Sequence, residues 1–203
     1  MIDGLLKSKI DPIWEAMSTP LVRAGLTPNQ VTFAGLVLIL VASGAYLLHG
    51  LALIYGISLA FAFAFDALDG AVARRTGLSS RAGGYFDAMV DRYQELIVLA
   101  AIALVNDQWP LALACFSGSV ITSYAKARTA LEIEVSNDDW PDFFERLERV
   151  IYLCAMLIGA GVLGGWVITL GLTGFAILSH LTALQRIRRA TALLRAADDQ
   201  ARR

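Results

Sequence analysis

Residues 51–74 have the sequence LALIYGISLAFAFAFDALDGAVAR. Fifteen uncharged and mostly apolar residues come first, and Asp66 and Asp69 follow them. The segment is longer than the roughly 20 residues with which a helix crosses a bilayer. Carboxylates within such a segment are costly and need a compensating partner, so they are candidates for function. The stretch therefore predicts a membrane-spanning helix with an acidic end.

Five further apolar segments of similar length accompany this one. They cover residues 28–48, 84–105, 109–130, 144–163 and 166–185. Hydrophobic residues make up 57% of the chain and charged residues 17%, whereas an average soluble domain is about 45–50% apolar. A soluble helical bundle is the alternative, but these segments lack the polar face that a surface helix keeps. We therefore expect an all-α integral membrane protein with six transmembrane helices.

The basic residues all fall on one side of the membrane in this six-span topology. If the segments cross alternately, all 17 Lys and Arg residues lie on the side of the N-terminus, and the three connections on the other side carry none. The positive-inside rule makes the basic side cytoplasmic. We therefore expect a multi-pass protein of the cell (inner) membrane, with both termini and the acidic helix ends in the cytoplasm.

The chain is expected to form a single domain over residues 1–203. Residues 2–26 combine apolar side chains, among them Trp14, with charged ones, which is typical of an amphipathic helix lying in the membrane interface. Residues 28–188 would form the six-helix bundle, and residues 189–203 a charged cytoplasmic tail. The net charge of −1 gives no indication of a nucleic-acid partner.

A second pair of carboxylates, Asp87 and Asp91, opens the third predicted span. Asp66 and Asp69 are three residues apart, and Asp87 and Asp91 are four apart, so each pair shares one helix face. Because a short loop joins the two helices, all four carboxylates can converge at the cytoplasmic boundary. Their mutual repulsion would be relieved by one or two hard divalent cations, Mg²⁺ or Mn²⁺. The alternative is pairing with nearby arginines: Arg74, Arg75, Arg81 and Arg92.

Residues 66–91 also carry a motif. They match the pattern DxxDGxxARx8GxxxDxxxD at every fixed position and spacing, and the chain thereby resembles the CDP-alcohol phosphotransferase family. The resemblance implies a membrane enzyme that splits a CDP-linked lipid and releases CMP. It implies that Asp66, Asp69, Asp87 and Asp91 together bind two metal ions. It also implies that Asp91 is the general base, which takes the proton from the acceptor hydroxyl as that oxygen attacks the β-phosphorus.

Small and polar residues near these carboxylates are candidates for binding the CDP group. Gly70 and Ala73 would let a flat nucleotide approach the helix, although helix–helix packing explains small residues equally well. Thr27 and Pro28 predict a capped helix start, and the family often has a similar Thr-Pro-Asn-x-x-Thr stretch near the nucleotide. The complete set of candidates is Asn29, Thr32, Asp69, Gly70, Ala73, Arg74, Arg81 and Gly83.

Three clusters of basic residues lie on the same side as the aspartates, at residues 123–128, 145–149 and 185–186. Several cations around one cavity would suit a phosphorylated acceptor, but from spacing alone they serve equally well as membrane anchors. The clusters are similar to those of the family's phosphatidylinositol-phosphate and archaetidylinositol-phosphate synthases. That resemblance implies acceptor-phosphate binding by Ser123, Lys126, Arg128, Arg149 and Arg186. Residues 132–142 are more acidic than in that branch.

The resemblance therefore implies transfer of the phosphatidyl group from CDP-diacylglycerol to inositol 1-phosphate in phospholipid biosynthesis. Glycerol 3-phosphate is the strongest rival acceptor. An ion-coupled membrane transporter is the alternative from another functional class, but it would spread charges through the membrane depth, whereas the carboxylates here cluster at one end of the spans. Family members are commonly homodimers, so a homodimer among membrane lipids is expected.

Overall fold

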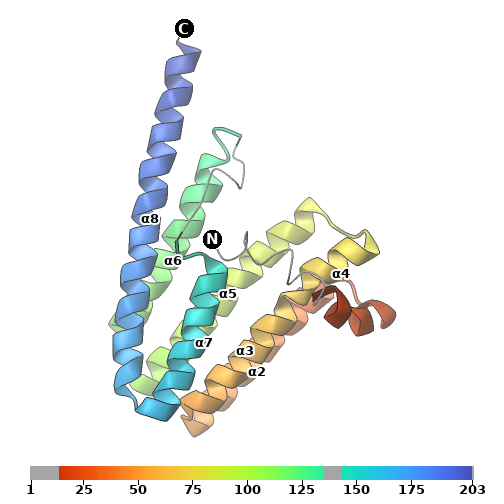
Figure 1. The fold of residues 1–203 in the computed structure, drawn as a ribbon, viewed down its shortest axis with the longest axis vertical. Helices are drawn as coiled ribbons and strands as arrows, with labels where there is room; N and C mark the ends of the chain where they lie inside the picture. The colour runs from red at the N-terminus through yellow and green to blue at the C-terminus, as the bar shows by residue number, and fades with distance from the viewer. Residues whose placement is uncertain (1–13, 135–142, 203) are drawn as a thin grey trace.

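Every regular element that the structure describes is a helix (Figure 1). The computed structural model describes residues 14–134 and 143–202. Residues 14–23 are helical, and the long elements follow as α2 (Pro28–His49), α3 (Ala52–Asp66), α4 (Leu68–Thr76), α5 (Arg81–Asn106), α6 (Trp109–Thr129), α7 (Arg146–Leu163) and α8 (Trp166–Ala201). The all-α prediction is confirmed within these ranges. The first part of the predicted interfacial helix, residues 2–13, lies outside them.

Three helices are long and apolar enough to cross a membrane: Pro28–His49, Ala52–Thr76 and Trp166–Ala201. The remaining three long helices, α5, α6 and α7, are more polar. Asp91, Arg92 and Glu95 lie on α5, α7 begins with several charged residues, and α6 is rich in Ser and Thr. Length and composition therefore support three of the six predicted spans directly, and the other three helices carry many of the polar residues of the site described below.

The six long helices close into a ring. Around it, each helix packs against the next in the order α2, α3, α7, α8, α6, α5 and back to α2. Glycines allow close approach at these contacts, because a Cβ atom at position 56 would lie 2.9 Å from the backbone nitrogen of Ile158, and one at position 118 would lie 2.8 Å from Ser179 Cβ. Small residues at helix contacts are the usual means of packing helices closely in membranes.

The ring encloses a continuous apolar core. Tyr55, Leu59, Ile102, Leu157 and Phe175 are among its fully buried side chains. Many large apolar side chains on the outside are exposed instead, which suits helices surrounded by lipid tails: Val41, Leu48, Phe61, Leu113, Val162 and Leu170.

Helix ends follow local sequence signals. The predicted capped start of α2 is confirmed, because Thr27 Oγ1 accepts a hydrogen bond from the Gln30 amide while Gln30 Oε1 accepts one from the Thr27 amide, and Pro28 occupies the first turn. The single predicted span of residues 51–74 is divided at Ala67, where α3 ends and α4 begins. The charged tail predicted for residues 189–203 is helical as far as Ala201 and continues α8 without a break.

The helix of residues 14–23 packs against the start of α2 and against α4. Its Trp14, Leu21 and Val22 cover the buried side chains Val31, Leu68 and Val72. Arg75 on α4 adds polar contacts, because its Nη1 donates to the Glu15 carbonyl and to Thr19 Oγ1, both at 2.6 Å. The helix is thereby held against the end of the bundle that carries the aspartates (Figure 1).

Candidate active site

The first two aspartates flank the break between α3 and α4. Asp66 is the last residue of α3 and is 1% exposed, and Asp69 lies in the first turn of α4. The other two project from successive turns of α5. The sequence predicted that the short loop would make the helices of the two aspartate pairs neighbours. In the structure α3, α4 and α5 come together through α2, which packs against all three. A Cβ atom at position 35 of α2 would lie 2.6 Å from Asp66 Oδ1, so Gly35 leaves the space into which this carboxylate turns.

Three of the four predicted carboxylates converge. Asp66, Asp87 and Asp91 offer oxygens that all lie within 4.8 Å of one another. Asp69 is not in this group; its Oδ2 accepts a hydrogen bond of 2.5 Å from Thr32 Oγ1, and its side chain contacts that of Asp87. The oxygen-only donor set suits a hard divalent cation, and clustered buried carboxylates require a compensating charge. These residues therefore fit a Mg²⁺ or Mn²⁺ ion, and the four-ligand set with two ions stays a prediction.

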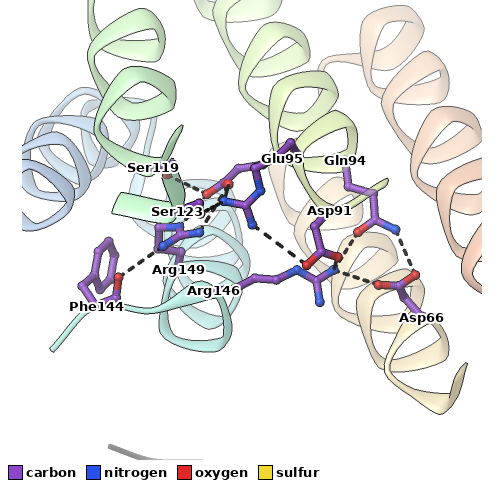
Figure 2. A network of polar contacts seen from close by, with 10 residues as sticks. Asp66, Asp91, Gln94, Glu95, Ser119, Ser123, Phe144, Arg146 and Arg149 are labelled. Atoms are coloured by element: carbon purple, nitrogen blue, oxygen red, sulfur yellow. Dashed lines mark hydrogen bonds and ion pairs between the residues drawn. The ribbon is translucent and has the colours of Figure 1, made fainter. Parts of the chain in front are cut away.

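Arg146, at the start of α7, supplies that compensating charge in the structure (Figure 2). Its Nη2 lies 2.8 Å from Asp66 Oδ2 and 2.5 Å from Asp91 Oδ1, and it donates at 2.8 Å to Gln94 Oε1. Gln94 in turn donates from Nε2 to Asp66 Oδ1 at 3.0 Å. Sequence reasoning missed Arg146 and looked for the aspartates' partners among the arginines close in sequence. Of those, Arg92 approaches Asp91, with Nη2 at 4.0 Å from Oδ2.

A cavity of about 440 Å³ lies beside the aspartates, between the start of α2, α4 and the start of α5. Most of the predicted CDP-binding residues line it: Asn29, Thr32, Asp69, Gly70, Ala73 and Gly83. Asp87 also lines it and so connects it with the carboxylate cluster. Two candidates lie elsewhere, since Arg74 lines the larger cavity described next and Arg81 lines neither of the two within the described ranges.

Gly70 distinguishes between the two explanations for the small residues on α4. A Cβ atom there would meet only Arg74 Nη1, at 3.5 Å. No neighbouring helix therefore requires a glycine at this position. The space above Gly70 belongs to the cavity, which favours room for a ligand over helix packing as the reason for the glycine.

A second cavity, of about 1030 Å³, is lined by Asp91. Of the predicted acceptor residues it is lined by Ser123, Lys126, Arg149 and Arg186, and Arg74, Arg92 and Arg146 add further positive charge. Apolar side chains such as Trp14 and Met89 line another part of it. The larger cavity is therefore lined by cationic and apolar side chains and reaches the aspartate cluster at Asp91.

Arg128 is a correction to the sequence prediction, since it does not line this cavity. Its Nη1 pairs with Glu132 Oε1 at 2.5 Å, and both side chains are about half exposed, at 50% and 51%. Arg128 lies two residues beyond Lys126, and on a helix residues two apart face in different directions. The pair with Glu132 thus engages the Arg128 side chain outside the set of residues that line the cavity.

Arg149 lines the cavity but is held tightly by the protein (Figure 2). It is 2% exposed, and its Nε donates to Glu95 Oε1 at 2.6 Å. Glu95 also accepts from Ser119 Oγ at 2.8 Å and pairs with Arg92 Nη1 at 3.3 Å. Sequence reasoning missed Glu95, although a carboxylate inside a span, four residues after Asp91, is the kind of signal that marks a functional group.

Arg186 and Arg92 are placed by hydrogen bonds at the rim of the same cavity. Arg186 Nη1 donates to the Thr122 carbonyl at 2.8 Å, and its Nη2 lies 3.2 Å from Glu145 Oε1. Arg92 Nη1 donates to Ser123 Oγ at 2.6 Å. The larger cavity therefore presents several positioned guanidinium groups, which is an arrangement that recognises phosphate or other anions.

Comparisons with known proteins agree with this geometry. The sequence model described as CDP-alcohol phosphatidyltransferase matches residues 25–183. The chain is 34% identical over 184 residues to the archaetidylinositol phosphate synthase of Pyrococcus horikoshii, covering 90% of this chain and 93% of that protein. It is 34% identical over 182 residues to the phosphatidylinositol phosphate synthase of Mycobacterium tuberculosis, covering 82% of this chain and 80% of that protein.

Two solved structures of the Mycobacterium tuberculosis phosphatidylinositol phosphate synthase are similar to the fold. The crystal structure with CDP-DAG bound has a TM-score of 0.74 at 30% identity and covers 88% of this chain and 94% of that chain. The crystal structure in complex with manganese and citrate has a TM-score of 0.77 at 26% identity and covers 87% of this chain and 88% of that chain.

Proposed function

Because the chain belongs to the CDP-alcohol phosphatidyltransferase family, we propose that it transfers the phosphatidyl group of CDP-diacylglycerol to inositol 1-phosphate and releases CMP. The observation that carries the proposal is that two different cavities reach the carboxylate cluster, one at Asp87 and the other at Asp91. One is lined by small and polar residues and the other by cations. The names of the relatives favour an inositol phosphate as the acceptor.

The smaller cavity is proposed to hold the CDP group. Gly70 and Ala73 leave room for the nucleotide against α4, and Asn29 and Thr32 present polar side chains from α2. Arg74, at the end of α4, lines the larger cavity and is proposed to contact the diphosphate from there. The apolar wall of that cavity, which includes Trp14 and Met89, is suited to the lipid part of the donor.

The acceptor is proposed to enter the cationic part of the larger cavity. Lys126, Arg146 and Arg186, with Ser123, would bind its phosphate group. Arg149 would act indirectly, since its guanidinium is engaged with Glu95. A phosphate group could accept charge-assisted hydrogen bonds from these cations that a neutral polyol could not match, so the pocket favours a phosphorylated alcohol.

The chemistry is a displacement at the β-phosphorus of the donor. Asp91 takes the proton from the acceptor hydroxyl, the bond from that oxygen to phosphorus forms, and the bond from phosphorus to the CMP oxygen breaks. Asp66, Asp69, Asp87 and Asp91 would hold Mg²⁺ or Mn²⁺, which when bound neutralises charge on the diphosphate. Because the two cavities would hold donor and acceptor beside the carboxylate cluster, positioning would contribute much of the rate.

The membrane arrangement is part of the proposal. With α2, α3 together with α4, and α5 to α8 as six spans, all basic residues lie on the side of the aspartates, and the positive-inside rule places that side in the cytoplasm. The exposed apolar side chains of α2 and α8 support contact with lipid. The homodimer expected from the resemblance remains a prediction.

Release of CMP from CDP-diacylglycerol by the purified protein tests the function. Inositol 1-phosphate should support release, and unphosphorylated inositol should not. Asp91→Asn should abolish it, because the amide cannot accept the proton. A preference for glycerol 3-phosphate would keep the anion pocket and change the acceptor, whereas a preference for a neutral alcohol would overturn the pocket. No CMP release with any alcohol would overturn the reaction.

A further inference from the structure

One nitrogen atom of Arg146 has surroundings that resemble those of a metal ion. Nη2 lies within 2.8 Å of three oxygens, which belong to Asp66, Asp91 and Gln94. A guanidinium NH₂ group has two hydrogens, so it cannot make a well-directed hydrogen bond to all three. Accordingly, Asp91 Oδ1 is in the ion pair but accepts no hydrogen bond of regular geometry among the described residues.

The same oxygens belong to the proposed metal site. Asp66 and Asp91 are two of the three residues whose carboxylate oxygens lie within 4.8 Å of one another. A divalent ion bound by both would compete with Nη2 for Asp66 Oδ2 and Asp91 Oδ1. Two cations sharing buried oxygens would also repel one another strongly. Full engagement of Arg146 and full ligation of a metal are therefore mutually exclusive.

Arg146 is able to leave this position. Its side chain is 33% exposed, and it borders the larger cavity together with Lys126 and Arg186. Arg149, one helical turn further along α7, has a side chain that is 3% exposed and paired with Glu95. Of these two arginines, only Arg146 has both the site contacts and an open route away from them.

We propose that Arg146 is a displaceable internal cation, which occupies the position between Asp66 and Asp91 in the metal-free protein and is moved into the acceptor cavity by metal binding. This inference rests on the metal site of the proposed function. It gives the arginine two states, one that holds the carboxylates together and one that adds a cation to the acceptor pocket. Metal loading would thereby complete the acceptor pocket, so that the phosphorylated alcohol binds best after the metal.

The competition has a measurable size. If the engaged state of Arg146 holds about nine tenths of the metal-free population, it weakens apparent metal binding about tenfold. Removing the arginine should remove that penalty. A tenfold change corresponds to about 1.4 kcal/mol.

The test is direct Mn²⁺ binding to the purified full chain in lipid nanodiscs, measured by electron paramagnetic resonance without substrates. Arg146→Gln should bind Mn²⁺ about tenfold or more tightly than the wild type. Arg188→Gln makes the same charge change at an exposed position of α8 and should leave the affinity within about twofold of the wild type. Equal affinities for Arg146→Gln and the wild type would overturn the inference.

A second measurement separates displacement from simple removal of a nearby charge. Structures of the wild type are determined with EDTA and with Mn²⁺, and the contacts of Arg146 Nη2 with Asp66 and Asp91 should be present in the first and lost in the second. Contacts retained beside a bound Mn²⁺ would refute displacement. The metal site itself is tested by Asp66→Asn, which should weaken Mn²⁺ binding. If the wild type binds no Mn²⁺, or if this variant binds it unchanged, the proposed metal site fails as well.

Discussion

Replacement of Arg149 by Met should destabilise the protein more than it affects substrate binding. Arg149 is 2% exposed and Glu95 is 6% exposed, and their ion pair, with Nε 2.6 Å from Oε1, is buried. Removing one partner of a buried pair costs about 3–5 kcal/mol. Because Glu95 would keep Arg92 at 3.3 Å and Ser119 at 2.8 Å, we expect the lower end, about 3 kcal/mol. For a chain of this size that corresponds to a fall in Tm of about 6–12 °C.

The assay is thermal unfolding in detergent, followed by intrinsic fluorescence. Arg128→Met is the matched control, because Arg128 forms an equally short pair with Glu132 at 2.5 Å, but on the exposed surface. Surface pairs contribute only about 0–1 kcal/mol, so its Tm should stay within a few degrees of the wild type. Adding Glu95→Gln to Arg149→Met should recover part of the loss, because it removes the charge of a buried carboxylate that has lost one of its two arginine partners.

The opposite result would refute this account of Arg149. If Arg149→Met left Tm within about 2 °C of the wild type and raised the KM for inositol 1-phosphate about tenfold or more, Arg149 would be a direct ligand of the acceptor. The buried Glu95 carboxylate would then not require Arg149 for the stability of the fold. The KM for CDP-diacylglycerol serves as the internal reference in the same CMP-release assay.

Three further predictions follow from the site and the topology. Activity should vanish in excess EDTA and return with Mg²⁺ or Mn²⁺, because the buried carboxylates are proposed to bind the ion; full turnover in EDTA would contradict this. Gly70→Ala should raise the KM for the CDP-lipid while leaving Tm unchanged or raising it by an amount equivalent to about 0.5–1 kcal/mol, since alanine is the better helix former; a lower Tm with an unchanged KM would indicate a packing role for Gly70. Single cysteines at Ser79 and Gly165, introduced after replacement of Cys115 and Cys154, should be labelled from opposite faces of the membrane, and labelling from the same face would refute the six-span topology.

Helix position and type could largely be predicted from the sequence, because the signals are local. Apolar runs and turn residues placed most of the helix ends to within a few residues, but α8 continues beyond the predicted span of residues 166–185 to Ala201, and the predicted span of residues 51–74 is divided into α3 and α4. The capping pair of Thr27 and Gln30 marks the start of α2. The spacing within each aspartate pair determines that its members share a helix face. None of these features depends on how distant parts of the chain meet.

The partners of the aspartates could not be predicted in this way. Arg146 lies 80 residues after Asp66, and its contact with that residue depends on how α7 is rotated within the ring of helices. Arg146 and Arg149 are three residues apart and lie on the same side of α7, so spacing could not separate the partly exposed arginine that reaches the carboxylates from the buried one that pairs with Glu95.

The sequence by itself thus determined the helices, the carboxylate motif and the family resemblance, since each depends on residues within one helix or one short segment. The tertiary structure alone decided which three carboxylates converge, that Gly35 of α2 makes room for Asp66, and that Arg128 pairs with Glu132 and does not line the cavity. The physical reason is that a helix fixes the relative directions of its own side chains, whereas the rotation of each helix against its two neighbours is set by packing over the whole ring.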